Sequence, residues 1–153
     1  DCEMDDDPYG ISKKKASDFI LKKGSHTKII KTSIIGPELN SNDSLLNWFL
    51  NSTGEVSGYS KAMWNGNTTL EWSKVCLDLI NNWDDYKNET ILSSPCISKY
   101  ELLKKIKEVY KKNISIISSD KVDINKCLNG DISTPPIDLQ LKELRSFYED
   151  LEH

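Results

Sequence analysis

The sequence predicts an α/β fold that is mostly helical, with a few short and largely parallel strands. First, a helical pattern over residues 9–23 leads directly into a β-branched stretch over residues 27–34, which is half of a βαβ unit. Second, further helical patterns alternate with short β-branched stretches along the chain. Third, the chain has too few strands for a complete doubly wound sheet. We therefore expect one part of a larger α/β protein.

Start and stop signals mark the expected helices. Pro8 suits a first helical turn, and Gly24 is a natural stop for that helix. Thr68 or Thr69 can cap the third helix, and Ser98 the fourth. The expected helices cover residues 9–23, 44–50, 69–83, 99–111 and 137–150. The expected strands cover residues 27–34, 90–92 and 113–117, with a short extended piece at 54–58 and a loop at 63–66.

Composition is that of an ordinary soluble chain. Of the 153 residues, 37% are hydrophobic and 29% are charged, and the net charge is −4. Lysine-rich runs are balanced by acidic ones, so we expect no nucleic-acid partner. No apolar run approaches the roughly 18 residues that cross a bilayer, and no signal peptide is recognisable, so we expect no membrane partner.

The cysteines do not form a recognisable metal or disulfide motif. No two of them make a Cys-x-x-Cys pair, and the chain has two histidines, so we expect no metal site. We interpret the cysteines as reduced thiols of a cytoplasmic protein. They are Cys2, Cys76, Cys96 and Cys127.

Two further patterns are interpreted as incidental to function. Four Asn-x-Ser/Thr triplets are expected to arise by chance in this Asn-rich chain rather than to accept glycans. They begin at Asn51, Asn67, Asn88 and Asn113. Residues 151–153 (Leu-Glu-His) resemble the start of an expression tag and are set aside.

Tyr9 and Lys13 form the most informative pair. They stand four residues apart, so on a helix both side chains rise from one face. A phenol has a pKa of about 10 in water. A neighbouring ammonium lowers that pKa and makes the phenol a usable proton donor to a carbonyl oxygen. The alternative is that Tyr9 is a core aromatic residue and Lys13 is solvated, since Tyr-x-x-x-Lys is common by chance.

Several stretches in order along the chain resemble one enzyme family. They are Tyr9-Gly10-Ile11-Ser12-Lys13, Lys31-Thr32-Ser33-Ile34-Ile35-Gly36-Pro37-Glu38-Leu39, Ser44-Leu45-Leu46-Asn47-Trp48-Phe49-Leu50, Trp64-Asn65-Gly66-Asn67-Thr68-Thr69-Leu70-Glu71 and Ile97-Ser98-Lys99-Tyr100-Glu101-Leu102-Leu103. Together they resemble extended short-chain dehydrogenase/reductases of the dTDP-4-dehydrorhamnose reductase branch. The resemblance implies the C-terminal portion of a Rossmann-type protein, with residues 1–36 ending the nucleotide-binding domain and residues 37–150 forming the substrate-binding portion.

The resemblance also implies a nicotinamide cofactor, NADPH or NADH. Tyr9 would be the general acid, and Lys13 would tune it and hold the cofactor ribose. Thr32, Ser33 and Ile35 would face the cofactor, as suits the carboxyl end of a parallel strand. Alternatively, Thr32 and Ser33 only bond their own backbone. The Gly-rich phosphate loop and the upstream Ser or Thr of the family are missing, so we expect this chain alone to have little activity.

Three residues are implied on the substrate side. Trp64 would stack on a base or sugar, Asn65 would bond a hydroxyl, and Lys126 would approach a phosphate. The alternatives are that Trp64 fills the core and that Lys126 is simply solvated. Ile34 departs from the family pattern, in which a Trp at this position helps to hold the sugar. The resemblance therefore does not identify the sugar.

The implied function is reduction of a nucleotide-linked 4-keto-6-deoxy sugar for surface polysaccharide. An epimerase on the same scaffold is a second interpretation, and it needs a further acid/base group that the sequence does not identify. A third is a non-catalytic module that binds a nucleotide sugar or a protein, because some relatives act as regulatory subunits of other enzymes. A homodimer is a further expectation.

Overall fold

The computed structural model describes residues 8–24, 26–38 and 43–151. The helices are α1 (Pro8–Lys23), α2 (Leu45–Asn51), α3 (Thr69–Asn81), α4 (Lys99–Val109) and α5 (Ile137–Leu151), with a 3-10 turn η1 at Trp83–Asp85. The strands are β1 (Ile29–Lys31), β2 (Ile34–Ile35), β3 (Glu55–Trp64), β4 (Asn67–Thr68), β5 (Glu89–Ser93), β6 (Ile97–Ser98), β7 (Ser115–Asn125) and β8 (Ile132–Ser133). The predicted α/β class with mostly parallel strands is confirmed.

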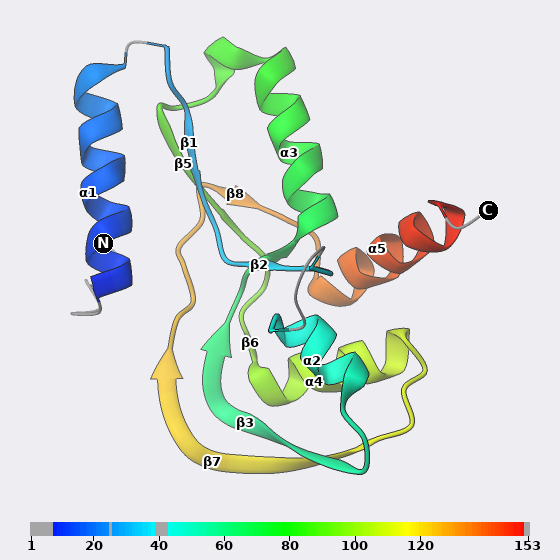
Figure 1. Ribbon diagram of the computed structural model, residues 1–153. Helices are drawn as coiled ribbons and strands as arrows, with labels where there is room; N and C mark the ends of the chain where they lie inside the picture. The colour runs from blue at the N-terminus through cyan, green and yellow to red at the C-terminus, as the bar shows by residue number, and fades with distance from the viewer. Residues whose placement is uncertain (1–7, 25, 39–42, 152–153) are drawn as a thin grey trace.

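A three-stranded parallel sheet forms the upper half of the molecule. Its order is β1-β5-β8, and Figure 1 places α1 on one side of it and α3 on the other. A short parallel pair, β2 with β4, continues below it. The sheet takes strands from both sides of residue 36, because the chain returns to it at β5 and β8. No boundary between sheets coincides with residue 36. The predicted division of the chain into residues 1–36 and 37–150 therefore stays a prediction.

A second three-stranded sheet lies in the lower half. The long strand β3 pairs in parallel with β7 and antiparallel with β6, with a bulge between Tyr59 and Lys61. Helix α4 crosses close to this sheet at Gly58, where an added Cβ would lie 2.9 Å from the Tyr100 backbone. A glycine is needed at this position because the helix backbone comes so near.

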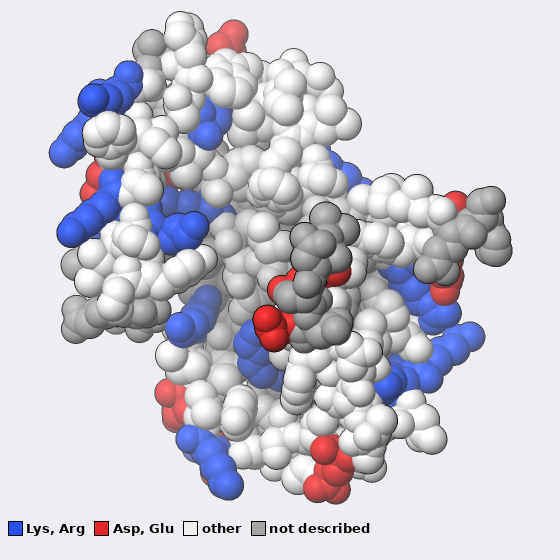
Figure 2. Space-filling model, viewed as in Figure 1, with Lys and Arg blue, Asp and Glu red and all other residues white. Residues whose placement is uncertain are grey.

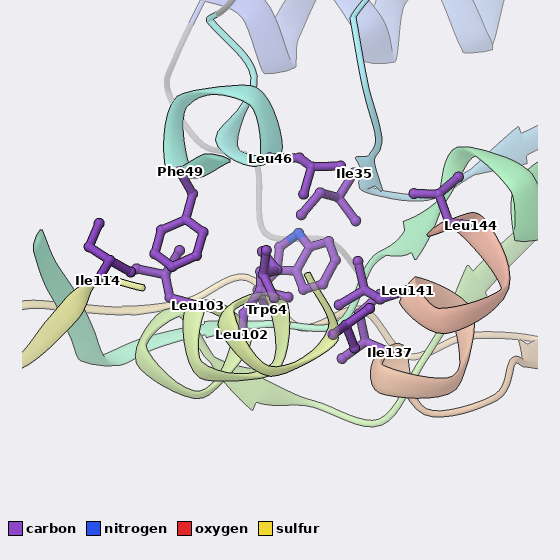
Figure 3. Packing of buried hydrophobic residues seen from close by; sticks show 12 residues of the cluster. Ile35, Leu46, Phe49, Trp64, Leu102, Leu103, Ile114, Ile137, Leu141 and Leu144 are labelled. Carbon is purple, nitrogen blue, oxygen red and sulfur yellow. The ribbon is translucent and has the colours of Figure 1, made fainter. Parts of the chain in front are cut away.

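One hydrophobic core joins the helices α2, α4 and α5 to the strands. Figure 3 shows Trp64 with Leu102, Ile137 and Leu141 around it, and Ile35 and Leu46 on the side of α2. Phe49, which is 0% exposed, anchors α2 in this cluster. Truncation of such a side chain to Ala costs about 3–5 kcal/mol of stability, so this cluster holds the lower half together.

The predicted caps of two helices are confirmed, and a third helix has a cap that was not predicted. Thr68 and Ser98, as predicted, and also Ser44 each accept a hydrogen bond with the side-chain hydroxyl from a backbone N–H in the first turn of the helix that follows. Each such cap contributes about 1 kcal/mol.

Most strand boundaries differ from the prediction. The expected strand over residues 27–34 is two strands, β1 and β2, with a turn between them. Residues 55–58 of the expected extended piece and residues 63–64 of the expected loop belong to β3, and the strand expected at 113–117 begins at Ser115 and continues to Asn125. Long parallel pairing between β3 and β7 supplies backbone partners that local sequence patterns do not reveal.

The prediction of reduced cysteines is wrong for two of them. Cys96 and Cys127 form a disulfide with their Cα atoms 6.0 Å apart, and among the described residues Cys76 is the free cysteine. Cys2 lies outside the described residues. The pairing arises because β6 and β7 flank β3, which brings together cysteines 31 residues apart in sequence.

The structure also shows where the Asn-x-Ser/Thr triplets and the C-terminal Leu-Glu-His residues lie. Asn67 is 0% exposed, so its triplet cannot accept a glycan in the folded chain, whereas Asn51, Asn88 and Asn113 are exposed. Leu151 is the last residue of α5, and Glu152 and His153 lie outside the described residues.

Candidate functional site

Tyr9 and Lys13 lie together in the first two turns of α1. The Lys13 Nζ is 5.4 Å from the centre of the Tyr9 ring, so both side chains are on the same side of the helix. The Tyr9 side chain is 68% exposed. In Figure 1, α1 and β1 run in opposite directions, so this end of α1 lies toward the end of the sheet at which β1 finishes. A phenol with an adjacent ammonium is thus displayed where ligands of parallel sheets collect.

A polar anchor holds α1 against the sheet. Ser17, the buried residue of α1, donates a hydrogen bond of 3.1 Å to Glu89 on β5. Glu89 also pairs with Lys31 on β1 at 2.9 Å. The hydrogen bond from Lys31 lowers the pKa of Glu89 below its usual value, against the effect of partial burial. The carboxylate therefore stays charged and links α1, β1 and β5.

Thr32 and Ser33 form the turn between β1 and β2, at the carboxyl end of β1. The Thr32 hydroxyl donates to the Ser33 carbonyl at 3.2 Å and accepts from the Asn67 side-chain amide at 2.8 Å. The Ser33 hydroxyl accepts from the Trp64 indole N–H at 2.7 Å. Both hydroxyls therefore bond within the fold, and a cofactor-facing role for them stays a prediction.

The two isoleucines of β2 point in opposite directions. Ile34, at the position where the family has a Trp, is 48% exposed, whereas Ile35 is 4% exposed and packs in the core. Alternation along a strand explains the difference. The side chain of Ile35 is thus turned away from the surface that carries Ile34, and its predicted contact with a cofactor stays a prediction.

Trp64 and Asn65 lie beneath the surface. Each is 5% exposed. Asn65 holds the segment after β7 through two hydrogen bonds of 2.8 Å to the backbone N–H and C=O of Leu128. Trp64 occupies the core, as in the alternative interpretation of this residue. Direct contact of either side chain with a substrate stays a prediction.

Lys126 directly follows β7, and its charge acts on Lys99, a lysine that the sequence analysis did not select. The Lys99 Nζ lies 5.1 Å from the centre of the Trp64 ring. Burial, and to a smaller extent the like charge of Lys126, lower the pKa of Lys99 below that of a free lysine. Figure 2 shows basic side chains over α1 and across the lower half of this face, with acidic ones between them.

Asn67 is the other residue that the sequence analysis missed. It is 0% exposed, donates to Thr32 and accepts from the Thr134 hydroxyl and from the Gln140 amide. It therefore joins the turn after β1 to the start of α5. Its position in the recognised Trp64–Glu71 stretch was the available signal, but the partners come from distant parts of the chain.

Solved structures of sugar-nucleotide enzymes are similar to this fold. A dTDP-4-dehydrorhamnose reductase from Bacillus anthracis in complex with NADP matches with a TM-score of 0.71 and 17% identity, over 92% of this chain and 54% of that one. The reductase from Yersinia enterocolitica matches with a TM-score of 0.66 and 15% identity, over 91% and 56%. A GDP-L-fucose synthetase from Naegleria fowleri matches with a TM-score of 0.60 and 15% identity, over 98% and 57%.

The chain has the fold of part of these reductases. It spans about half the length of the solved structures that it matches. No family model and no curated protein matches the sequence. At these identities the likeness shows the reductase fold, and the chemistry has to be argued from the residues.

The reductase fold carries two separate polar regions in this chain. One is the Tyr9–Lys13 pair in the first two turns of α1, and the other consists of Lys99 at the start of α4 and Lys126 directly after β7. Within residues 8–24, 26–38 and 43–151, no three His, Cys, Asp or Glu side chains gather as metal ligands. Across the same residues, no helix has the length and apolar character to cross a membrane.

Proposed function

We propose that this chain is the C-terminal part of an NAD(P)-dependent reductase that acts on a nucleotide-linked 4-keto-6-deoxy sugar. The observation that carries the proposal is the Tyr9–Lys13 pair, with its ammonium 5.4 Å from the ring centre, at the carboxyl end of a parallel sheet of the reductase fold. The pathway we assign is deoxysugar supply for surface polysaccharide, in the cytoplasm.

In the proposed mechanism, Tyr9 donates a proton to the carbonyl oxygen of the sugar. The positive charge of Lys13 favours the phenolate that this transfer leaves behind. The residues present fit the nicotinamide end of a dinucleotide, because Lys13 offers an exposed ammonium for ribose hydroxyls at the end of α1 that lies toward the carboxyl end of β1. When bound, the cofactor supplies the hydride. A Gly-rich loop for its pyrophosphate would come from the upstream half.

The substrate side of the proposal uses the second polar region. Lys126 and Lys99 would bind the diphosphate of the nucleotide sugar, because paired ammonium groups match its charge. Trp64 and Asn65 would act from below: Trp64 supports the Lys99 ammonium, and Asn65 holds the segment that carries Lys126. Ile34 would contribute an exposed apolar contact near the sugar in place of the aromatic ring of the family.

The test is Tyr9→Phe in the protein extended upstream to its full reading frame. We expect turnover with dTDP-4-dehydrorhamnose and NADPH to fall at least about a hundredfold, because general acid catalysis contributes about 10²–10⁴ in rate. Tyr59→Phe is the matched control, since Tyr59 is an exposed tyrosine on β3. Normal turnover of the Tyr9→Phe protein would reject the reductase assignment.

A non-catalytic module that binds a nucleotide sugar is the second candidate. The observation that favours it is that the Lys99–Lys126 pair is contained within this chain, whereas the catalytic half depends on upstream residues. Titrations of the chain with dTDP and with NADPH separate the candidates. Tight binding of NADPH by the chain alone would contradict our assignment of the phosphate loop to the upstream half.

A further inference from the structure

The turn between β1 and β2 is held in place by the junction of β3 and β4. The Asn67 backbone N–H donates to the Ser33 carbonyl at 2.8 Å, and the Asn67 side-chain amide donates to the Thr32 hydroxyl at 2.8 Å. The Trp64 indole N–H donates to the Ser33 hydroxyl at 2.7 Å. A side chain at Gly66 would collide with the Ser33 carbonyl, so the junction lies directly against the turn.

Backbone groups fix the orientation of the Gln140 and Asn67 side-chain amides. The Gln140 side-chain oxygen accepts from the Thr68 N–H at 2.8 Å, and its nitrogen donates to the Pro135 carbonyl at 2.6 Å. Since an N–H only donates and a carbonyl only accepts, the Gln140 amide has one possible orientation. Its nitrogen then donates to the Asn67 side-chain oxygen at 3.2 Å. The Asn67 side-chain nitrogen is therefore the atom that faces Thr32.

Thr32 and Ser33 differ in where their hydroxyl protons go. The Thr32 hydroxyl accepts from Asn67 and donates its own proton to the Ser33 carbonyl at 3.2 Å. That carbonyl also accepts from the Asn67 N–H, so both of its lone pairs are used. The Ser33 hydroxyl accepts from the Trp64 indole, which only donates, and among the described residues its proton has no acceptor. In this turn, Ser33 is thus the side chain with a proton to give to a ligand.

Ser33 also lies where a parallel sheet binds its ligands. β1 and β5 are parallel, and the turn follows the carboxyl end of β1. Ser33 is half-buried, so its hydroxyl is within reach of a ligand and partly shielded from water. In Figure 3 the indole nitrogen of Trp64 points toward the side on which Ile35 lies, two residues after Ser33. A nicotinamide carboxamide has one oxygen that accepts and an amide nitrogen that donates, and a hydroxyl proton pairs with the oxygen.

We propose that Ser33 donates a hydrogen bond to the carboxamide oxygen of the nicotinamide cofactor, and that Trp64 is the positioning residue that orients the Ser33 hydroxyl. Thr32 serves the turn itself and gives no proton to the cofactor. This inference rests on the proposed function, because it takes a nicotinamide cofactor at this end of the sheet as its ligand. It separates two neighbouring hydroxyls that the sequence pattern treats alike.

The experiment compares cofactor analogues on the protein extended upstream to its full reading frame, with dissociation constants measured by calorimetry. The acetylpyridine analogue of NADP keeps the carbonyl oxygen and lacks the amide N–H groups, whereas the thionicotinamide analogue replaces that oxygen with sulfur, a weak acceptor. We expect Ser33→Ala to weaken binding of NADP and of the acetylpyridine analogue about three- to tenfold, as loss of one hydrogen bond does, and binding of the thionicotinamide analogue less than about twofold. Ser60→Ala is the matched control, because the Ser60 hydroxyl donates within the fold, to the Ser119 carbonyl at 3.1 Å.

Two further variants test how the Ser33 hydroxyl is oriented. Thr32→Val removes the neighbouring hydroxyl and should leave the preference for NADP over the thionicotinamide analogue unchanged. Trp64→Phe keeps an aromatic ring in the core but removes the indole N–H, so the Ser33 hydroxyl is free to turn and that preference should fall. When Ser33 is already alanine, Trp64→Phe should reduce the preference no further. A merely structural role of Trp64 would weaken binding of all three cofactors alike, and this result would remove its positioning role.

The wild-type chain by itself gives a second measurement that needs neither a variant nor a cofactor. The indole proton of Trp64 should exchange with solvent at least about tenfold more slowly than that of Trp72, which is 37% exposed, when both are followed by NMR. Equal exchange rates would show that the bond between Trp64 and Ser33 is absent, and the inference would fall.

The outcomes separate this inference from the proposed function. Equal loss of affinity for all three cofactors in Ser33→Ala overturns the assignment of Ser33 and leaves the reductase proposal standing. Loss for NADP with the acetylpyridine analogue spared would make the carboxamide nitrogen the partner, which contradicts the hydrogen-bond direction at Ser33. Failure of the extended protein to bind NADP rejects the proposed function, and this inference with it.

Discussion

Replacement of Cys96 by serine should destabilise the chain by several kcal/mol. The bridge closes a loop between cysteines 31 residues apart in sequence. For such a loop, the chain-entropy relation gives about 12 cal/mol/K of entropy removed from the unfolded chain, or about 3.7 kcal/mol at room temperature. This is a large fraction of the roughly 5–15 kcal/mol that holds a domain folded, yet it leaves a folded state.

The assay is urea denaturation of the oxidised wild type and of Cys96→Ser. The midpoint should fall for the variant, and the slope should rise, because the unfolded chain without the bridge exposes more surface. Cys76→Ser is the control. The Cys76 thiol is half-buried and forms no disulfide, so we expect the free energy of unfolding to change by less than about 1 kcal/mol.

Two results would refute this reasoning. The first is a Cys96→Ser chain as stable as a wild type in which the Cys96–Cys127 bridge has formed. That outcome would show that the bridge does not constrain the unfolded chain as calculated. The second is titration of all four thiols in the wild type, which would show that the bridge is absent.

Two further predictions concern buried and charged anchors of the candidate site. Asn67→Ala should lower the free energy of unfolding, measured by urea denaturation, by about 3 kcal/mol, because Asn67 is fully buried and its loss leaves Gln140 without one of its hydrogen-bond partners. A loss below about 1 kcal/mol would contradict the hydrogen-bond network around Asn67. The pKa of Glu89 is lower in the folded chain than its ordinary value of 4.5, so its stabilising effect is present above that value and is lost as the pH falls below it. The wild type should therefore lose more stability than Glu89→Gln on acidification from neutral pH, and parallel stability curves for the two chains would contradict the Lys31–Glu89 link.

Local sequence signals were sufficient for the helices and for the Tyr9–Lys13 pair. Pro8 and Gly24 mark the ends of α1, and Ser98 caps α4, because caps and breakers act within one helical turn. The four-residue spacing alone places Tyr9 and Lys13 on one face, since a helix repeats every 3.6 residues. These features depend only on residues close in the chain.

Long-range pairing decided what the sequence did not show. Three features follow from β6 and β7 lying on either side of β3. They are the length of β3 and β7, the Cys96–Cys127 bridge and the effect of the Lys126 charge on the pKa of Lys99.

By itself, then, the sequence determined the class of fold, the helices with their caps, and the one-face pairing of Tyr9 with Lys13. Only the tertiary structure decided that Trp64 lies in the core, that Asn67 joins Thr32 to Gln140, and which cysteines meet. The physical reason is that a helical turn is set by neighbours in the chain, whereas contacts between strands depend on register across many residues.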